Sequence, residues 1–306
     1  MVKLQPSKLI TGVRFPPPAP DQSIFTMPFD FSSLPSLQKV DLESPVKFFE
    51  TSCKKHIAYR AYETDSDKSL VFIHGSGLHS WYLHSLGSYL ARKHVCSVYC
   101  PDILGHGYSD GKQGHIESVE LNYRCMGEFI SFTKSSCSRL FIGGHSSGAS
   151  QAIRLANDIS KKALAGCVFV APFLGPRSST MRHERDGFIR VDMDKLGPLF
   201  SSGCQNSDEL TMYFDIPVEF RNHLCPQAYS FNMMMAQTLY DEKELTQLAQ
   251  PTFLAIGKND EVFDYRAYHQ LLPQHGSLEV IENASHISIL ENSNCLRLMC
   301  NWIIRI

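Results

Sequence analysis

The chain has 306 residues, of which 43% are hydrophobic and 20% charged, and its net charge at pH 7 is −2. This balance fits one large domain or a core domain with an insertion, and the lack of a basic excess argues against a nucleic-acid partner. Its 10 cysteines form no CxxC pair, which argues against a zinc site and favours a reducing, cytoplasmic setting. No apolar run approaches the roughly 18 residues of a membrane-spanning helix, and no signal peptide is evident, so we expect a soluble, unexported protein.

Residues 1–26 are expected to be disordered or foreign to the fold. Pro16, Pro17, Pro18 and Pro20 force extended backbone that cannot join a helix or the interior of a sheet. The stretch GVRFPPPAP also resembles the translated 3′ end of a transfer-RNA gene. We therefore expect Met27 to be the natural start, with a genuine proline-rich linker as the alternative.

From Val46 onward, short apolar runs alternate with helical patterns. The centres of these runs are rich in Val, Ile, Phe and Leu without polar alternation, which is typical of strands buried on both faces. The alternation predicts an α/β fold, with a mostly parallel sheet and helices on both of its faces. The predicted strands are 56–62, 69–74, 96–102, 139–144, 166–172, 252–257 and 278–282, and the predicted helices lie near 80–93, 117–134, 147–160, 264–272 and 292–304.

Residues 174–250 interrupt this rhythm. The stretch shows no clear buried strand and contains segments with a helical pattern. We predict that it is an inserted helical cap on a core domain formed by residues 27–173 and 251–306.

Two stretches match the GxSxG pattern, GYSDG at 107–111 and GHSSG at 144–148. In this motif a sharp turn from strand to helix lifts the serine hydroxyl above the sheet edge. GHSSG directly follows a predicted strand and leads into a predicted helix, whereas GYSDG follows a loop. The sequence therefore predicts Ser146 as a nucleophile and places Ser109 in a loop.

A serine hydroxyl needs a base within hydrogen-bond reach and a group that orients the base. In hydrolases of this fold, the acid and then the histidine follow the serine, each in a loop after a late strand. Asp260 follows the strand at 252–257, and His286 follows the strand at 278–282. These positions predict Asp260 as the acid and His286 as the base.

Three other residues compete for these roles. Glu261 and Asp264 share the loop of Asp260, although Asp264 is better placed to cap the helix predicted to begin at Tyr265. His275 precedes the last strand in a tight turn, so it would lie at the opposite edge of the sheet.

The same chemistry requires an oxyanion hole of backbone N–H groups, each worth about 3 kcal/mol. One donor should be the amide of Ser147, the residue after the nucleophile. The second should come from the loop HGSGLHS at 74–80, in which Ser76 is the candidate and Gly75 and Gly77 let the backbone bend. A plain glycine turn between strand and helix is the alternative.

Five motifs together resemble the monoglyceride lipase and lysophospholipase branch of the α/β-hydrolases. They are HGSGLHS at 74–80, DILGHGYSDG at 102–111, GHSSG at 144–148, GKNDEVFD at 257–264 and ASH at 284–286. The resemblance implies an eight-stranded α/β-hydrolase fold, triad roles for Ser146, Asp260 and His286, and oxyanion amides at Ser76 and Ser147. One departure concerns the elbow, where lipases of this branch often read GHSMGG but this chain has Ser147 and Ala149.

These observations predict a serine hydrolase that cleaves carboxylic esters through an acyl-enzyme, without a metal or cofactor. We expect a small-molecule ester or lipid substrate of the monoacylglycerol or lysophospholipid type, and peripheral membrane contact stays compatible with the sequence. Thioesterase, amidase or peptidase, and carbon–carbon bond hydrolase activity remain alternatives on the same triad, as does a non-catalytic receptor. Apolar residues of the predicted cap would face an acyl chain or simply pack against the core: Phe231, Met233, Met234, Met235 and Leu239.

Overall fold

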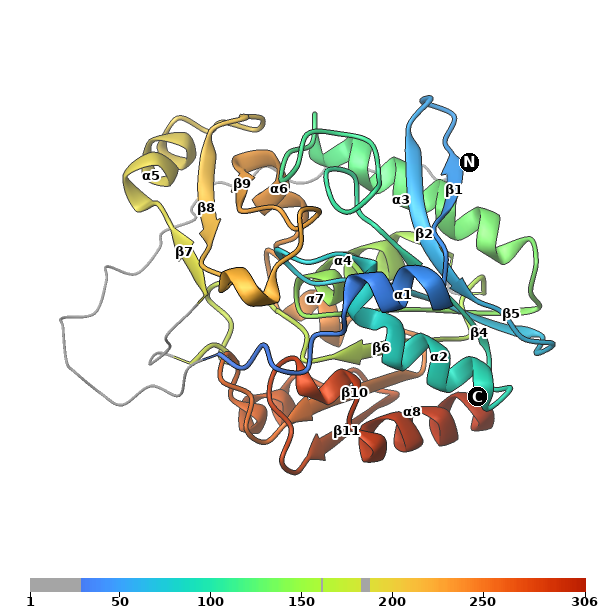
Figure 1. Ribbon diagram of the computed structural model, residues 1–306. Helices are drawn as coiled ribbons and strands as arrows, with labels where there is room; N and C mark the ends of the chain where they lie inside the picture. Colours follow the sequence, from blue (N-terminus) through green and yellow to red (C-terminus); the bar gives the residue numbers. More distant parts are fainter. Residues whose placement is uncertain (1–28, 161, 183–187) are drawn as a thin grey trace.

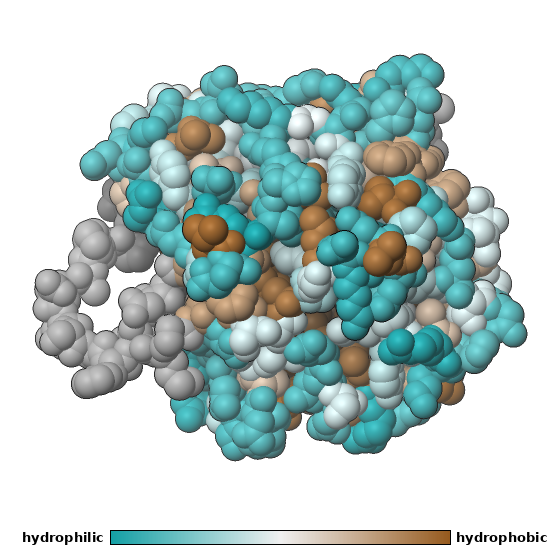
Figure 2. Space-filling view, viewed as in Figure 1, coloured by the Kyte–Doolittle hydropathy of each residue, from teal (hydrophilic) through white to brown (hydrophobic). Residues whose placement is uncertain are grey.

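The computed structural model describes residues 29–160, 162–182 and 188–306. The prediction for residues 1–26 lies outside the described residues. Within the described part of the chain, every helix falls short of the length and apolarity needed to cross a bilayer. Figure 2 shows one face of the molecule, on which scattered apolar side chains interrupt a mostly hydrophilic surface.

An eight-stranded sheet, in the order β1-β2-β4-β3-β5-β6-β10-β11, forms the centre of the molecule (Figure 1). From β4 to β11 in this order, neighbouring strands are parallel, whereas β1 and β2 pair antiparallel with their neighbours. The predicted mostly parallel sheet is confirmed. The strands are β1 (Lys47–Glu50), β2 (His56–Tyr62), β3 (Lys68–Ile73), β4 (Ser97–Pro101), β5 (Arg139–His145), β6 (Gly166–Val170), β10 (Thr252–Gly257) and β11 (Gly276–Ile281).

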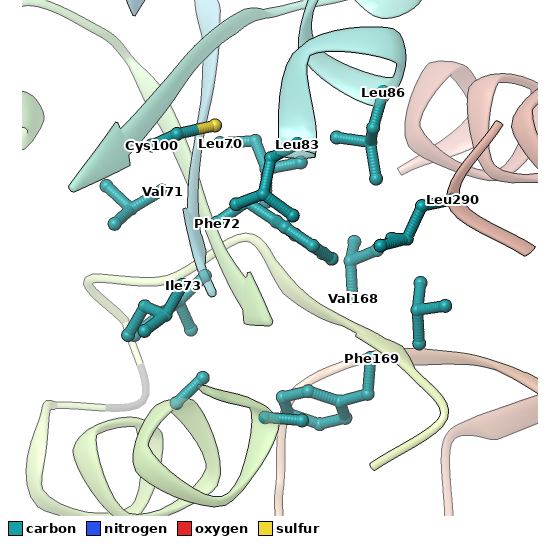
Figure 3. Packing of buried hydrophobic residues seen from close by; sticks show 14 of the residues in the cluster. Leu70, Val71, Phe72, Ile73, Leu83, Leu86, Cys100, Val168, Phe169 and Leu290 are labelled. Carbon is teal, nitrogen blue, oxygen red and sulfur yellow. The ribbon is translucent and has the colours of Figure 1, made fainter. Parts of the chain in front are cut away.

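All seven predicted strands are present in this sheet, and β1 is its one strand that the sequence analysis did not predict. Its four residues, KFFE, lie at the edge of the sheet and are mostly exposed, so they lack the buried apolar run of the central strands. Figure 3 shows the contrast at β3, where Phe72 lies beside Leu83 while Val71 and Ile73 lie on the other side of the strand. Burial on both faces explains why the central strands read as continuous apolar runs.

Helices cover both faces of this sheet, with α2 and α8 in contact on one side and α3 and α4 on the other (Figure 1). The predicted helical regions are all present, although 264–272 forms a short 3₁₀ helix. Serine caps α3, whose Leu121 N–H donates to Ser118 Oγ at 3.1 Å. The elements are α1 (Leu37–Glu43), η1 (Ser80–Leu83), α2 (His84–Arg92), α3 (Val119–Lys134), α4 (Ser147–Asp158), η3 (Tyr265–Gln270), η4 (Ser288–Leu290) and α8 (Ser293–Arg305).

Residues 174–250 do not form a wholly helical insertion, so that part of the prediction is wrong. The segment contains a three-stranded antiparallel sheet, β7-β8-β9, beside its helices. Two of these strands have only three residues each, and a segment of that length is too short to show a periodic pattern in the sequence. The elements are β7 (Ile189–Val191), α5 (Met193–Ser201), β8 (Leu210–Phe214), η2 (Val218–Phe220), β9 (Ala228–Ser230), α6 (Phe231–Ala236) and α7 (Lys243–Thr246). The division into core and cap stays a prediction, and "cap" below means residues 174–250.

Candidate active site

Ser146 lies at the sharp turn between β5 and α4. Its φ of 53° and ψ of −123° are an unfavourable combination for a residue with a side chain. Two backbone hydrogen bonds hold the turn: Ser146 N–H donates to Val170 O at 3.1 Å, and Phe173 N–H donates to Ser146 O at 3.0 Å. The surrounding strands thus maintain a strained conformation at the residue predicted to be the nucleophile.

Glycine is required where backbone segments meet around this turn. A Cβ atom at Gly148 would lie 2.3 Å from the carbonyl oxygen of His74, and one at Gly75 would lie 3.1 Å from Ser146 Cβ. The loop after β3 therefore contacts the Ser146 turn directly, as an oxyanion loop would have to do.

Ser109, in the second GxSxG match, belongs to a loop as predicted. Its hydroxyl donates to Asp102 O at 2.7 Å and accepts from Ala58 N–H at 2.8 Å. This hydroxyl is buried and connects the loop after β4 to β2, and Ser109 does not border the pocket described below.

His286 and Asp260 form a buried pair, with 2.8 Å between His286 Nδ1 and Asp260 Oδ2. They come from the loops after β11 and β10, which are neighbouring strands of the sheet. The other carboxylate oxygen of Asp260 accepts from the N–H groups of Val262 at 2.9 Å and Phe263 at 2.8 Å. These bonds fix the carboxylate so that it faces the imidazole.

Four effects set the pKa of His286. Burial alone would lower it, but the negative charge of Asp260, the hydrogen bond to Asp260 and the charge of Glu261 outweigh burial. The pKa of His286 therefore lies above its ordinary value of 6.5.

The competing residues occupy other positions. Glu261 accepts from His286 N–H at 2.8 Å and from Asp30 N–H at 3.0 Å. Its carboxylate therefore holds the backbone of the loop that carries His286 and does not compete for the role of the acid. Asp264 accepts from Arg266 N–H at 3.0 Å and caps η3, as predicted. The carbonyl of His275 accepts from the first residue of β10, Thr252, which places His275 at the opposite edge of the sheet.

Ser146 and His286 border one pocket. Within the described residues, the Ser146 hydroxyl makes no hydrogen bond, so the structure brings serine and histidine to one site without joining them. Catalytic hydrogen bonds of this kind are often long without substrate and tighten when it binds.

The loop after β3 borders the pocket through Ser76, and one of its backbone amides is without a partner among the described residues. Gly75 N–H donates to the hydroxyl of Tyr82 at 2.7 Å, and Gly77 N–H donates to the hydroxyl of Tyr229 at 2.8 Å. Between them, Ser76 N–H has no hydrogen-bond partner among the described residues. Ser147 is the first residue of α4, where a helix leaves its N–H groups without internal partners.

His145 is a site residue that the sequence analysis did not assign, although it precedes Ser146 in the GHSSG motif. Burial holds the pKa of His145 well below its ordinary value, so the ring is neutral. Its Nδ1 accepts from Tyr82 OH at 2.9 Å, and its Nε2 donates to His286 O at 2.9 Å. The Tyr82 hydroxyl also accepts from Gly75 N–H, so the His145 ring connects the loop that contains Gly75 to the backbone of His286.

The pocket has a volume of about 490 Å³ and lies between the sheet edge and the cap. Cap residues provide an apolar wall, while Ser178, Asp241 and Glu242 add polar groups. Of the five apolar residues considered earlier, Met234, Met235 and Leu239 line the pocket, whereas Phe231 and Met233 do not and are buried in packing. Other residues of the apolar wall are Phe188, Ile189, Val191, Leu196, Phe200 and Met212.

Residues 29–160, 162–182 and 188–306 contain no group of three or more His, Cys, Asp or Glu side chains that could hold a metal ion. The polar groups of the pocket are instead hydroxyls, an imidazole and carboxylates.

Comparisons with known proteins place this geometry in context. A family model described as serine aminopeptidase, S33, matches residues 64–293. A monoglyceride lipase of Saccharomyces cerevisiae has a similar structure, with a TM-score of 0.67 and 14% identity over 85% of this chain and 94% of that chain. A monoacylglycerol lipase of Paleococcus ferrophilus gives a TM-score of 0.57 and 18% identity over 81% of this chain and 98% of that chain.

A thermophilic esterase of Thermogutta terrifontis is also similar, with a TM-score of 0.61 and 14% identity over 85% of this chain and 98% of that chain. No curated protein matches the sequence. At these identities the likeness shows the fold, and it confirms the predicted α/β-hydrolase architecture.

Proposed function

The chain belongs to the serine aminopeptidase S33 family of α/β-hydrolases, and on that premise we propose that it is a serine hydrolase that cleaves carboxylic esters. Ser146 would be the nucleophile, His286 the base and Asp260 the group that orients it. The observation that carries the proposal is the strained Ser146 turn on the same pocket as the buried His286–Asp260 pair. Strained backbone and a charge-coupled histidine at one pocket are typical of catalytic sites.

The reaction begins with proton transfer. Nδ1–H of His286 donates to Asp260 at 2.8 Å, which leaves Nε2 free to take the proton of the Ser146 hydroxyl as its oxygen attacks the ester carbonyl. Protonated His286 then gives this proton to the departing alcohol. Water, activated by the same imidazole, hydrolyses the acyl-enzyme and restores Ser146.

The amides of Ser76 and Ser147 would stabilise the oxyanion of both tetrahedral intermediates. Ser76 N–H is left free while its two glycine neighbours are held by tyrosine hydroxyls. Ser147 N–H adds the positive end of the α4 dipole. Donors held in place before the reaction avoid the reorganisation that water would require.

The apolar wall favours a medium or long acyl chain. A side of the pocket lined by Leu196, Met212 and Met234 can accommodate methylene groups, each worth about 0.8 kcal/mol when buried. Monoacylglycerols and lysophospholipids both combine such a chain with a polar alcohol, and the uncharged glycerol of a monoacylglycerol fits the polar groups near Glu242. The lipase names among the similar structures agree with this substrate class.

Cleavage of amides is a second candidate. The carboxylates of Asp241 and Glu242 border the pocket, where they would attract a substrate that carries an ammonium group. The description of the matching family names an aminopeptidase. Aminoacyl p-nitroanilides turned over faster than p-nitrophenyl octanoate would favour this second candidate.

Labelling with a fluorophosphonate probe tests the proposed nucleophile. The parent protein should be labelled and should hydrolyse p-nitrophenyl octanoate, and the Ser146→Ala variant should do neither while keeping its thermal unfolding transition. Ser109→Ala is the matched control from the second GxSxG match and should remain labelled. Labelling that persists in Ser146→Ala would refute the assignment, and a parent protein that reacts with neither compound would favour a receptor.

A further inference from the structure

A buried chain of polar side chains joins the cap to the loop that carries the proposed oxyanion donors. The hydroxyl of Ser147 donates to Gln237 Oε1 at 2.6 Å. The hydroxyl of Ser76 lies 3.2 Å from the same oxygen and 2.8 Å from Ser147 Oγ. One amide oxygen from the cap thus contacts the side chains of both residues whose backbone N–H groups would hold the oxyanion.

The amide nitrogen of Gln237 continues the chain away from the pocket. It donates to the hydroxyl of Tyr229 at 3.0 Å, which also accepts from Gly77 N–H and donates to His106 Nε2 at 2.5 Å. Burial holds the pKa of His106 well below its ordinary value, so the ring is neutral and its Nε2 can accept. The oxygen of Gln237 faces donors and its nitrogen faces an acceptor, which fixes the orientation of the amide.

The chain has little freedom to rearrange. Gln237 is 2% exposed, and Tyr229 and His106 are fully buried. A buried polar group that loses its partner costs about 1–3 kcal/mol, so any other rotamer of Gln237 would leave several groups unsatisfied at once. Fully satisfied networks of this kind hold one arrangement of the surrounding backbone.

On this basis, and resting on the proposed function, we propose that Gln237 is a positioning residue for the oxyanion hole. Through the hydroxyls of Ser76 and Ser147 it holds both donor amides in register, and through Tyr229 it ties the same loop to the cap. Oxyanion stabilisation depends on donors placed before the reaction, and small displacements weaken it strongly. The cap therefore contributes to the chemical step as well as to the walls of the pocket.

Steady-state kinetics with p-nitrophenyl octanoate test this role in Gln237→Met, Ser147→Ala and the double variant. Loss of one oxyanion donor costs about 10²–10³ in kcat. Gln237→Met keeps both donor amides and only loosens their positions, so its kcat should fall by a smaller factor, roughly 10-fold, with KM nearly unchanged. Ser147→Ala keeps the donor amide but removes the hydroxyl, so it should show a similar loss. The kcat of the double variant should be no lower than that of the slower single variant, because both changes remove the same constraint on the donor amides.

A second readout is inhibition by octylboronic acid, which forms a tetrahedral adduct with a catalytic serine. In each variant, the inhibition constant of octylboronic acid should rise by about the factor by which kcat falls. The inhibition constant of the product octanoate should stay near the value of the parent protein. Ser147→Ala makes a smaller change than Gln237→Met, so it keeps the proposal testable should Gln237→Met fail to fold.

Gln250→Met is the matched control. Gln250 is a buried glutamine, 4% exposed, that donates to Ala156 O at 3.3 Å and does not border the pocket. It should lose thermal stability but keep the kcat of the parent. An unchanged kcat in Gln237→Met, or losses that multiply in the double variant, would overturn the proposal. A parent protein without Ser146-dependent turnover would instead overturn the proposed function, and this inference with it.

Discussion

His286 Nδ1 lies 2.8 Å from Asp260 Oδ2, and both side chains are almost completely buried. Because Asp260 also accepts two backbone N–H groups, its carboxylate cannot turn away from the imidazole. This arrangement favours one histidine tautomer, with the proton on Nδ1 and the lone pair on Nε2, on a residue that borders the pocket.

Asp260→Asn should lower kcat for p-nitrophenyl octanoate by about 10⁴-fold, because an amide in this position favours the wrong tautomer of His286. The fold should persist, since the substituted side chain has nearly the same shape. Asp264→Asn is the control: Asp264 caps η3 and should be replaceable with little loss of activity. Comparable losses in the two variants would show that Asp260 has no special role.

Glu261→Gln should shift the pH dependence of kcat/KM. The charge of Glu261 helps to raise the pKa of His286, so its removal lowers that pKa. A base with a lower pKa stays neutral to lower pH, and the acidic limb of the profile should therefore move toward lower pH. Glutamine can still accept from His286 N–H, so the plateau should be largely kept. Glu282→Gln, which removes an exposed carboxylate paired with Lys258, should leave the limb in place.

Met212→Trp should shorten the preferred acyl chain. Met212 lines the apolar wall of the pocket and is only partly buried, so the larger ring can extend into the cavity. Each methylene excluded loses about 0.8 kcal/mol of burial, so kcat/KM for dodecanoyl esters should fall at least about 10-fold while acetyl esters are spared. Met193→Trp changes an exposed methionine outside the pocket and should leave the chain-length profile unaltered.

Alkylation of the native protein should be confined to three of its ten cysteines. Seven are buried, and burial raises the pKa of a thiol such as Cys167 to about 12, which suppresses the reactive thiolate. Mass spectrometry after brief iodoacetamide treatment at pH 8 should find label on Cys53, Cys137 and Cys204 only. Denatured protein should be labelled at all ten, and native labelling of Cys167 would contradict its complete burial in β6.

Local patterns in the sequence were sufficient to predict much of the fold and of the candidate site. The central strands have unbroken apolar runs because both of their faces are buried, and the positions of Asp260 and His286 follow from the rule that loops after parallel strands meet at one edge. The GxSxG motif around Ser146 could be distinguished from the second match around Ser109 because a strand and a helix flank it directly.

Contacts between distant segments could be seen only after folding. Gln237 and Tyr229 lie in the cap and reach Ser147 and Gly77 through side-chain geometry that no local spacing encodes. The strands of the cap are three to five residues long, so their pairing depends on neighbours rather than on their own pattern.

The sequence by itself therefore determined the central strands of the large sheet, its covering helices and the loops that carry reactive side chains, because apolar periodicity and turn chemistry act over a few residues. The tertiary structure alone decided which polar groups satisfy one another around the pocket, because burial forces each hydrogen-bonding atom to find a partner wherever the chain brings one.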